Sequence, residues 1–595
     1  MGEQVRTILA NLAWLRRQPG SGRIRRQTFA GLGLNLIIVI GGASIPAVVI
    51  NLLTQPQVLP LVGIMALVAG LALASWFYDQ NTTATLWGTI ALRMQLSLKD
   101  AKTFLNLPYL VQTNPTIQAQ RAESAKRGFE DDERGVGPFV TAGTQLLESC
   151  LIAVIIIVIS LTLAWWIPGV LVGTIALTLV ALYQLNQFRT QASAKLNQLY
   201  FRQNYFFETA FSSQASEDMR LFHFDGLMIQ NIDKLQAEIL GLERVVNRHQ
   251  QLIELLISGI SALRMLTVYG WLLWLTINGH QSVGQFTFYF VLLSTIEGLV
   301  RASSLALSEF LRANTDLTIG RQFIETYEGA EDSVLSPAIT RQGLKVIFNH
   351  VSFSYGDQVI IDDLSFTIRS GESIALVGSN GAGKTTLTML LMGMIRPTSG
   401  EIFFNDQSIN NLTTAEILAY FSTMFQDNVI FAADVQQNVS VSRDPSVESV
   451  RQALSQAGLY DRIAALPDQE ATEMTQYLSS DGVSLSGGET EKLMLARMVY
   501  HAAPMVILDE PTAALDALAE SQLYQQIQHL VKGRTSLFIS HRLASTGFAD
   551  RIFFMRAGRI IAEGTHAQLL QTSSDYRALF NAQRQYYAEG GDQHA

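Results

Sequence analysis

The stretch SIALVGSNGAGKTTLTMLLM, residues 373–392, indicates how the C-terminal part of this 595-residue chain folds. It begins as a buried-strand pattern, continues as the glycine-rich sequence GSNGAGKTT (378–386), and ends in an apolar helical run. A strand, such a loop and a helix in this order match the phosphate loop G-x-x-x-x-G-K-[ST]. Glycines let backbone N–H groups curve around phosphate oxygens, and the N-terminus of the following helix faces the anion. The stretch therefore predicts a nucleotide-binding α/β domain of the P-loop type.

The loop itself supplies most of the predicted binding groups for ATP. Lys384 is expected to reach the β- and γ-phosphates, and the Thr385 hydroxyl is expected to ligate Mg²⁺. The cofactors predicted from this motif are therefore ATP and Mg²⁺. The candidate nucleotide-binding residues of the loop are Gly378, Ser379, Asn380, Gly381, Ala382, Gly383, Lys384, Thr385 and Thr386.

A second buried strand, MVIL (505–508), ends in two acidic residues. If this strand lies beside 373–377 in a parallel sheet, its carboxyl end carries Asp509 toward Mg²⁺. Glu510 then lies where it can orient or polarise the attacking water. The alternative is an ordinary buried strand followed by a helix-capping acid, which the upstream phosphate loop disfavours.

The composition of the whole chain indicates that part of it lies in a membrane. Only 16% of residues are charged, against about 25% in soluble domains, and 48% are hydrophobic. The net charge of −9 argues against a nucleic-acid-binding surface, so no nucleic-acid partner is expected. The single cysteine, Cys150, excludes an internal disulfide and any multi-cysteine metal site.

Three long stretches without Asp, Glu, Lys or Arg identify the membrane part: 27–78, 149–188 and 265–296. A spanning helix needs about 20 apolar residues, so each stretch holds two helices or most of two. Turn-forming residues interrupt each stretch near its middle. Six spans are therefore predicted, near 28–53, 57–78, 139–163, 168–188, 252–277 and 284–308.

The basic residues predict how these spans are oriented. Lysine and arginine are absent from the short breaks and gather before the first span, before the third and after the fourth. The positive-inside rule then places both termini and the two long loops in the cytoplasm of a multi-pass cell-membrane protein. A cleaved signal peptide is the alternative, but the first apolar run exceeds the 7–15 residues typical of one.

These features together predict the fold class and the domain organisation. Residues 1–330 are expected to form an α-helical membrane domain, whose six transmembrane helices continue as long cytoplasmic extensions. A linker is expected at 331–343, and an α/β P-loop nucleotide-binding domain at 344–595.

With these motifs the chain resembles the ATP-binding cassette (ABC) transporters, specifically the exporter-type half-transporters. Tyr355 matches the aromatic residue that stacks on adenine, and Gln426 matches the glutamine that links the nucleotide site to the membrane part. The further motifs that carry the resemblance are LSGGE (485–489) as the signature motif, LDEP (508–511), ALD (514–516) as the D-loop and ISHR (539–542).

The resemblance implies ATP hydrolysis coupled to transmembrane transport. In this family ATP lies between the phosphate loop of one domain and the signature motif of another, where Ser486, Gly487 and Gly488 would meet the γ-phosphate. The implied catalytic residues are Glu510, His541 as a switch residue, and Gln426. The implied metal ligands are Thr385, Gln426 and Asp509.

The same resemblance implies that two chains are needed for two complete sites. Glu510 and both signature glycines are present, which favours a homodimer over a heterodimer with one degenerate site. Glu489 stands where glutamine is commoner, and this departure is expected to be tolerated.

The sequence says least about the cargo. The resemblance is closest to half-transporters that export lanthipeptides and other modified peptides, so a peptide or another amphipathic compound is expected. The alternatives are a multidrug or lipid exporter of the same fold and, less favoured, a nucleotide-gated channel or a regulatory membrane ATPase.

Two kinds of residue are candidates for coupling and cargo binding. The turn at Leu107-Pro108-Tyr109 and the segment 217–222 are candidate coupling helices, with plain helix packing as the alternative. Ionisable residues inside a membrane usually face a cavity or a partner. Those within or beside predicted spans are Glu148, Glu254, Arg264, Glu297 and Arg301, of which Glu297 and Arg301 have the spacing of a local ion pair.

Overall fold

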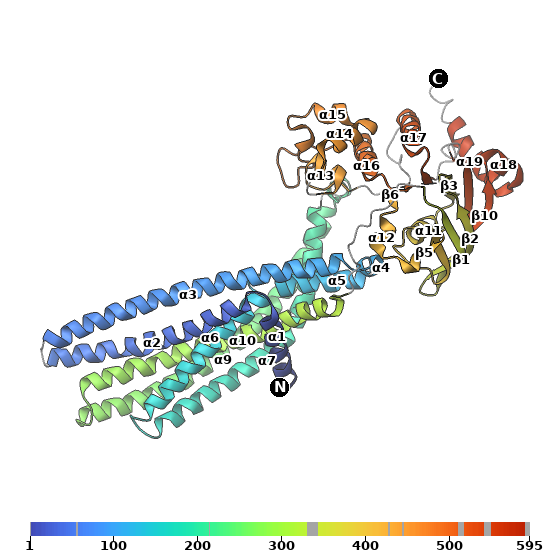
Figure 1. Cartoon of the computed structure of the whole chain (residues 1–595). Coiled ribbons are helices and arrows are strands. Elements are labelled where there is room, and N and C mark those ends of the chain that lie inside the picture. The colour runs from blue at the N-terminus through green and yellow to red at the C-terminus, as the bar shows by residue number, and fades with distance from the viewer. Residues whose placement is uncertain are drawn as a thin grey trace. The chain divides into compact units, whose positions relative to one another are not determined.

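The computed structural model contains two compact units, each described here by itself (Figure 1). One unit comprises Met1–Leu105 and Pro115–Glu328, and the other comprises Asn106–Asn114 and Gly329–Ala595. The structure describes residues 2–54, 58–212, 215–329, 343–426, 429–442, 445–509, 517–540 and 549–589. Apart from Gly343, the linker expected at 331–343 lies outside the described residues.

The first unit is helical. Its elements are α1 (Gly2–Arg17), α2 (Ser21–Thr54), α3 (Val58–Leu105), α5 (Pro115–Ser124), the π-helix η1 (Ala125–Phe129), α6 (Val136–Ser160), α7 (Ile167–Phe211), α8 (Ser216–Leu221), α9 (Phe224–Ile277) and α10 (Val283–Tyr327).

Within the described ranges, six helices are long and apolar enough to cross a membrane: α2, α3, α6, α7, α9 and α10. At 1.5 Å per residue, the 54 residues of α9 extend about 80 Å, well beyond the roughly 30 Å hydrocarbon core of a bilayer. Large apolar side chains on these helices are exposed, among them Leu73, Leu263 and Leu266 at 60%, 68% and 75%. A lipid environment accommodates such exposure, whereas water would not.

Of the clusters of buried apolar side chains that hold the described helices together, two are the largest. One joins α6, α7, α9 and α10 through Ile156, Leu171, Leu272 and Leu292. The other contains Phe129, which is fully buried, and lies where η1 meets α10. Phe129 fits there because Gly320 of α10 has no side chain: a Cβ on Gly320 would lie 2.7 Å from the Phe129 ring.

The second unit contains two sheets. A four-stranded antiparallel sheet has the order β2-β1-β4-β5, and a six-stranded sheet has the order β10-β9-β3-β8-β7-β6. The strands are β1 (Val346–Tyr355), β2 (Gln358–Ile368), β3 (Ser373–Gly378), β4 (Ser399–Phe404), β5 (Gln407–Ser408), β6 (Phe421–Met424), β7 (Met505–Asp509), β8 (Thr535–Ile539), β9 (Arg551–Arg556) and β10 (Arg559–Gly564).

Short helices complete this unit. They are α4 (Tyr109–Gln112), α11 (Lys384–Leu391), η2 (Ile409–Asn411), α12 (Thr414–Leu418), α13 (Val435–Ser440), α14 (Val447–Gln456), α15 (Tyr460–Ala464), η3 (Gln469–Ala471), α16 (Gly487–His501), α17 (Ala517–Val531), α18 (His566–Thr572) and α19 (Ser574–Glu589). Helices and strands thus alternate as expected of an α/β domain, and the predicted fold class is confirmed.

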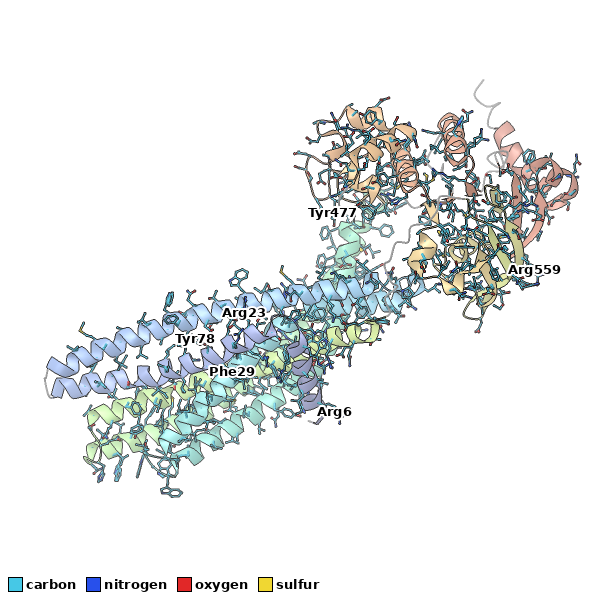
Figure 2. All side chains as sticks on the ribbon, viewed as in Figure 1. Arg6, Arg23, Phe29, Tyr78, Tyr477 and Arg559 are labelled. Atoms are coloured by element: carbon cyan, nitrogen blue, oxygen red, sulfur yellow. The ribbon has the colours of Figure 1, made fainter. Side chains whose placement is uncertain are left out.

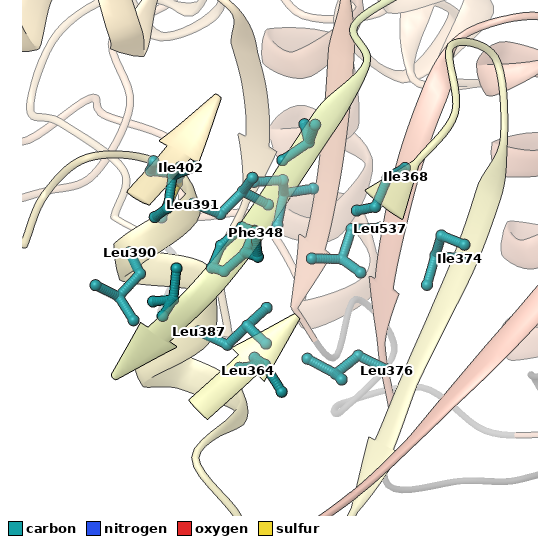
Figure 3. Close-up of a cluster of buried hydrophobic side chains, with 14 of the residues drawn as sticks. Phe348, Leu364, Ile368, Ile374, Leu376, Leu387, Leu390, Leu391, Ile402 and Leu537 are labelled. Atoms are coloured by element: carbon teal, nitrogen blue, oxygen red, sulfur yellow. The ribbon is translucent and has the colours of Figure 1, made fainter. Parts of the chain in front are cut away.

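A core between the two sheets positions the helix that follows the phosphate loop. Phe348 of β1 stacks on Phe366 of β2 with ring centroids 4.5 Å apart. Leu387 and Leu391 of α11 are buried in the same cluster, near Phe348 and Leu376 (Figure 3). The apolar face of α11 is therefore anchored, which leaves its N-terminus at the end of β3.

The segment Asn106–Asn114 belongs to the second unit, although the sequence suggested that 1–330 forms the membrane domain. Pro108 precedes α4, and Tyr109 packs against the core between the two sheets. This aromatic contact explains why a turn between α3 and α5 clusters with residues more than 200 positions later in the chain.

The contact between Phe129 and Gly320 yields a stability prediction. Gly320→Ala should lower the free energy of unfolding by about 1–3 kcal/mol, because the added methyl group overpacks the Phe129 ring. In a Phe129→Leu background the same change should lower the free energy of unfolding by less, because the smaller side chain of leucine leaves room for the methyl group. Thermal unfolding of the full chain in detergent, measured for the four variants, tests this coupling. Strictly additive costs would contradict it.

Candidate nucleotide-binding site

Parallel strands bring the predicted motifs to one edge of the six-stranded sheet. β3 pairs with β8, β8 with β7 and β7 with β6, all in parallel, so their carboxyl ends lie at the same edge. The phosphate loop follows β3, and Gln426 follows β6 by two residues. Asp509 ends β7, in register with Ile539 at the end of β8. Four segments far apart in the sequence therefore converge on one site.

The strand order corrects one expectation. β7 was expected beside β3, but β8 lies between them, with Leu376 and Asp509 each facing Ile539 in the register. Asp509 is therefore two strands from the phosphate loop. It still belongs to the same edge, since both intervening pairings are parallel.

The glycines of the phosphate loop satisfy two different constraints. Gly381 and Gly383 have φ angles of +77° and +101°, a backbone conformation that residues with side chains rarely adopt. Gly378 instead allows close approach, because a Cβ there would lie 2.3 Å from the backbone oxygen of Met555 on β9. The loop shape thus depends on a neighbouring strand as well as on the loop sequence.

Lys384 is held over its own loop. Its ammonium group donates to the backbone oxygens of Gly378 at 2.9 Å and Ser379 at 3.2 Å, and the residue is only 7% exposed. Phosphate oxygens are stronger acceptors for an ammonium group than neutral carbonyls are. Lys384 is therefore placed to transfer its hydrogen bonds to a phosphate without leaving the loop.

Most of the remaining predicted residues of the loop are accessible. Ser379, Asn380, Gly381 and Thr385 are exposed, and Thr386 is half-buried. Ala382 and Gly383 are buried beneath them.

Tyr355, at the end of β1, is 44% exposed and touches Phe353 edge-on, with ring centroids 4.8 Å apart. One face of the Tyr355 ring can therefore accept an aromatic base.

The residues present fit a magnesium ion. Mg²⁺ prefers hard oxygen ligands, and it is commonly held by one or two protein groups together with substrate phosphates and water. Thr385 offers a hydroxyl, and Asp509 a carboxylate at the same sheet edge. The described residues contain no group of three or more His, Cys, Asp or Glu suited to a metal, so phosphates and water would complete the coordination.

Several predicted residues lie outside the described residues. They are Glu510, the D-loop residues 514–516 and His541. Gln426 is described and exposed, and the predictions for Glu510 and His541 rest on the sequence.

The signature motif begins α16, whose N-terminus is capped by Ser486 together with Glu489. The Ser486 N–H and hydroxyl both donate to Glu489 Oε2, at 2.9 and 3.0 Å, while the Glu489 N–H donates to the Ser486 hydroxyl at 3.4 Å. This is a capping box, in which glutamate or glutamine serves at the third helical position. The glutamate at this position thus has a structural role that glutamine also fills.

Arg462 adds a contact that the sequence does not reveal. Its Nε lies 2.9 Å from Glu489 Oε1, an ion pair between residues 27 positions apart on α15 and α16. The hydrogen bond from the Ser486 backbone N–H, helped by Arg462, lowers the pKa of Glu489 below its ordinary value. The carboxylate therefore stays charged at neutral pH beside the exposed signature residues Ser486 and Gly487.

The charged residues predicted within the spans lie at different places in the helical unit. Glu148 of α6 lines a cavity with α2, α3 and α10, whereas Glu254 and Arg301 line a cavity of about 200 Å³ between α7, α9 and α10. Arg264 is buried at 5% exposure. The side chain of Glu297 lies outside the described residues, so its pairing with Arg301 stays a prediction.

Comparison with known proteins agrees with this site. A family model described as ABC transporter matches residues 361–513, which include the phosphate loop, the signature motif and Asp509. This segment is therefore similar to the ABC transporter family. The matched segment lies wholly within the second compact unit.

Two relatives in sequence support the assignment. An ATP-dependent lipid A-core flippase of Burkholderia thailandensis is 34% identical over 288 residues, covering 47% of this chain and 48% of that protein. An uncharacterized ABC transporter ATP-binding protein of Bacillus subtilis, YwjA, is 31% identical over 312 residues, covering 52% and 54%. The chain thus spans about half the length of the curated relatives it matches.

A solved structure extends the likeness to both units. A bacterial Atm1-family ABC exporter with ATP bound matches with a TM-score of 0.75, over 94% of this chain and 98% of that chain, at 22% identity. At that identity the likeness establishes the fold, which is that of an ABC exporter with six apolar helices.

The capping box predicts how substitutions at Glu489 affect stability. Glu489→Ala should lower the free energy of unfolding by about 1 kcal/mol. Glu489→Gln should lower it by much less, because the amide oxygen still accepts a hydrogen bond from Ser486. Since the pKa is lowered on folding, the carboxylate contributes stability at neutral pH that is lost as the pH falls through its folded pKa. Thermal unfolding of the three proteins between pH 3 and 7 measures both effects. An equally large loss in both variants would contradict the capping role.

The position of Lys384 predicts a binding defect. Lys384→Ala should weaken binding of a fluorescent ATP analogue by at least about tenfold, since charge-assisted hydrogen bonds are each worth about 1.5–3 kcal/mol. Lys345→Ala is the matched control, because that lysine pairs with Asp406 at 2.9 Å on the surface of the same unit. Equal affinities of the two variants for the ATP analogue would show that Lys384 does not bind the nucleotide.

Proposed function

We propose that this chain is an ATP-driven membrane exporter that works as a dimer by alternating access. The observation that carries this proposal is the sheet edge where the phosphate loop and Asp509 converge, in a chain whose described residues also form six helices able to cross a membrane. A site built for nucleotide and Mg²⁺ in the same chain as a membrane unit is suited to coupling hydrolysis to movement across the bilayer.

In this proposal each site residue has a role in ATP hydrolysis, and the roles of Glu510 and His541 rest on the sequence. Lys384 transfers its hydrogen bonds from the carbonyls of its loop to the phosphates, and Tyr355 accepts the adenine on its exposed face. Thr385 and Asp509 would hold Mg²⁺. Bound Mg²⁺ neutralises charge that develops on the phosphates. Glu510, directly after Asp509, orients the attacking water, and His541 and Gln426 respond to the γ-phosphate.

A second copy of the chain completes the site. Ser486 and Gly487 are exposed at the N-terminus of α16, where helix N–H groups favour an anion, so they are available to a phosphate held by another subunit. Each chain has one phosphate loop and one signature motif, and both are intact. We therefore favour a homodimer over a heterodimer.

The coupling between the two units is proposed to use the segments identified in the sequence. Tyr109 of α4 already packs on the core of the nucleotide-binding unit. Leu221 at the end of α8 and Phe222 after it are 72% and 62% exposed, an apolar tip that would become buried on a partner subunit. The distribution of basic residues supports a cytoplasmic nucleotide-binding domain and cytoplasmic termini.

The proposed cargo is an amphipathic compound. The relatives named as lipid A-core flippases support a lipid at least as well as the peptide that the sequence suggested. Both classes combine an apolar part with a polar group, and multidrug exporters handle compounds of the same kind. A peptide cargo is retained as an outcome of the experiment.

ATPase activity of the chain, purified alone in lipid nanodiscs, tests the proposal. Glu510→Gln should bind ATP yet nearly abolish hydrolysis, because the water-orienting carboxylate is lost. Stimulation by one class in a panel of lipids, modified peptides and hydrophobic cations would nominate the cargo. Uptake into inverted vesicles then has to be ATP-dependent and against a gradient, which separates an exporter from a channel.

Two results would contradict parts of the proposal. Absence of activity with the chain alone, under conditions where ATP still binds, would contradict the homodimer. Hydrolysis by Glu510→Gln at the wild-type rate would contradict the role of that residue.

A further inference from the structure

The helical unit contains a cavity of about 530 Å³ where α2, α3, α6 and α10 meet. Its lining includes Tyr78, which lies on α3 (Figure 2). Residues with hydroxyl and amide groups are the most numerous in the lining, and its apolar side chains are those of Leu86, Ile152, Leu299 and Ala302. A cavity of this kind among membrane helices is of the size that holds small molecules.

Glu148 of α6 supplies the one carboxylate in this lining. Its Oε2 accepts two hydrogen bonds, from Asn35 Nδ2 of α2 and from the Tyr78 hydroxyl of α3, both at 3.0 Å. Three helices therefore converge on one carboxylate oxygen. This arrangement fixes the position of the side chain, and within the part of the chain that the structure describes no hydrogen bond reaches Oε1, which can accept from another donor.

The backbone of α2 makes room for this cluster. A Cβ on Gly31 would lie 2.9 Å from Asn81 Nδ2 and 3.7 Å from Glu148 Oε1. Asn81 in turn donates to the backbone oxygen of Gln27 at 2.7 Å. The small residue at position 31 thus keeps Glu148 and Asn81 side by side at the cavity wall.

The charge of Glu148 has no basic counterpart in the cavity. None of the lining residues, all of which the structure describes, is a lysine, arginine or histidine. Both side chains that donate to Glu148 are neutral. A carboxylate within a membrane is costly unless a cation or hydrogen bonds compensate it, and such residues usually serve a function.

The cavity lies at one end of the charge-free segments. Tyr78 is the last residue of the charge-free stretch 27–78, and Glu148 immediately precedes the stretch 149–188. Position 148 lies in the cytoplasmic half of the predicted span 139–163, on the side of the hydrocarbon core nearer the cytoplasmic polar region, where the head group of an amphipathic molecule lies.

We propose that this cavity binds the primary ammonium group of an amphipathic cargo, with Glu148 Oε1 accepting a charge-assisted hydrogen bond. Threonine hydroxyls, among them those of Thr82 and Thr141, line the space beside the ammonium group. Ile152 and Leu299 provide apolar surface for the start of the attached chain. The inference rests on the proposed exporter function and specifies one chemical group of its cargo.

Photolabelling in the absence of ATP tests the binding site separately from transport. The full chain in nanodiscs is labelled with a dodecylamine that carries a diazirine, and labelled peptides of α2, α3, α6 and α10 are quantified. Excess dodecylamine should protect these peptides, whereas dodecanol and dodecanoate should not. Glu148→Gln should raise the concentration of dodecylamine needed for protection at least about tenfold, because it removes the charge but keeps an acceptor for Asn35 and Tyr78.

Asp79→Asn is the matched control, since Asp79 is exposed, adjoins Tyr78 and does not line the cavity. It should leave protection by dodecylamine unchanged. In Glu148→Asp, which retains the charge, dodecylamine should protect the peptides at a lower concentration than in Glu148→Gln. Binding of an ATP analogue verifies that each variant is folded.

The outcomes distinguish the two proposals. Equal protection by the amine and the alcohol, or unchanged protection in Glu148→Gln, would overturn the ammonium site. Protection by dodecanoate alone would show that the cavity binds an anionic group, and this result would also overturn the ammonium site. Amine binding without ATPase activity or transport would leave the site standing and contradict the exporter function.

Discussion

The parallel pairing of β3, β8, β7 and β6 is the constraint on which the nucleotide site depends. Because these strands run in the same direction, the segments that follow them meet at one sheet edge, although they lie up to about 160 positions apart in the chain. The core between the two sheets holds α11 against this edge, so the phosphate loop is fixed at both ends. Met555 of β9 limits the space above the loop, which is why Gly378 cannot carry a side chain. The shape of the phosphate loop therefore depends on the strand order of the sheet and on the packing of the core as well as on its own sequence.

The helical unit satisfies a different requirement. Its long helices keep backbone hydrogen bonds internal, which a lipid environment demands, and they expose large apolar side chains such as Leu266. Some polar groups inside the unit bond to one another, as Glu148 does with Asn35 and Tyr78. In such surroundings an incompletely compensated carboxylate attracts a ligand of opposite charge. The proposed affinity of the cavity for a cation and the helical structure of the unit thus have the same cause, which is the low dielectric constant of the membrane.

Much of the fold was predictable because its signals are local. The glycine-rich loop between a strand and a helix, and the charge-free stretches, need only neighbouring residues to be recognised. The nucleotide-binding residues of the phosphate loop follow from that motif. Other features join residues that are distant in the sequence. The position of β8 between β3 and β7, the ion pair of Arg462 with Glu489 and the packing of Tyr109 on the sheet core are of this kind. Spacing along the chain carries no information about such contacts.

By itself, the sequence determined the class of this protein: helices that fit a bilayer, followed by a P-loop domain with the motifs of an ABC transporter. Periodicity, charge distribution and short motifs are properties of contiguous residues, so no folding was needed to recognise them. Only the tertiary structure decided how the signature helix is capped and paired, and why glutamate suits position 489. It also decided that Glu148 meets Asn35 and Tyr78 around a cavity. These features depend on the packing of separate elements, which is set by the chain as a whole.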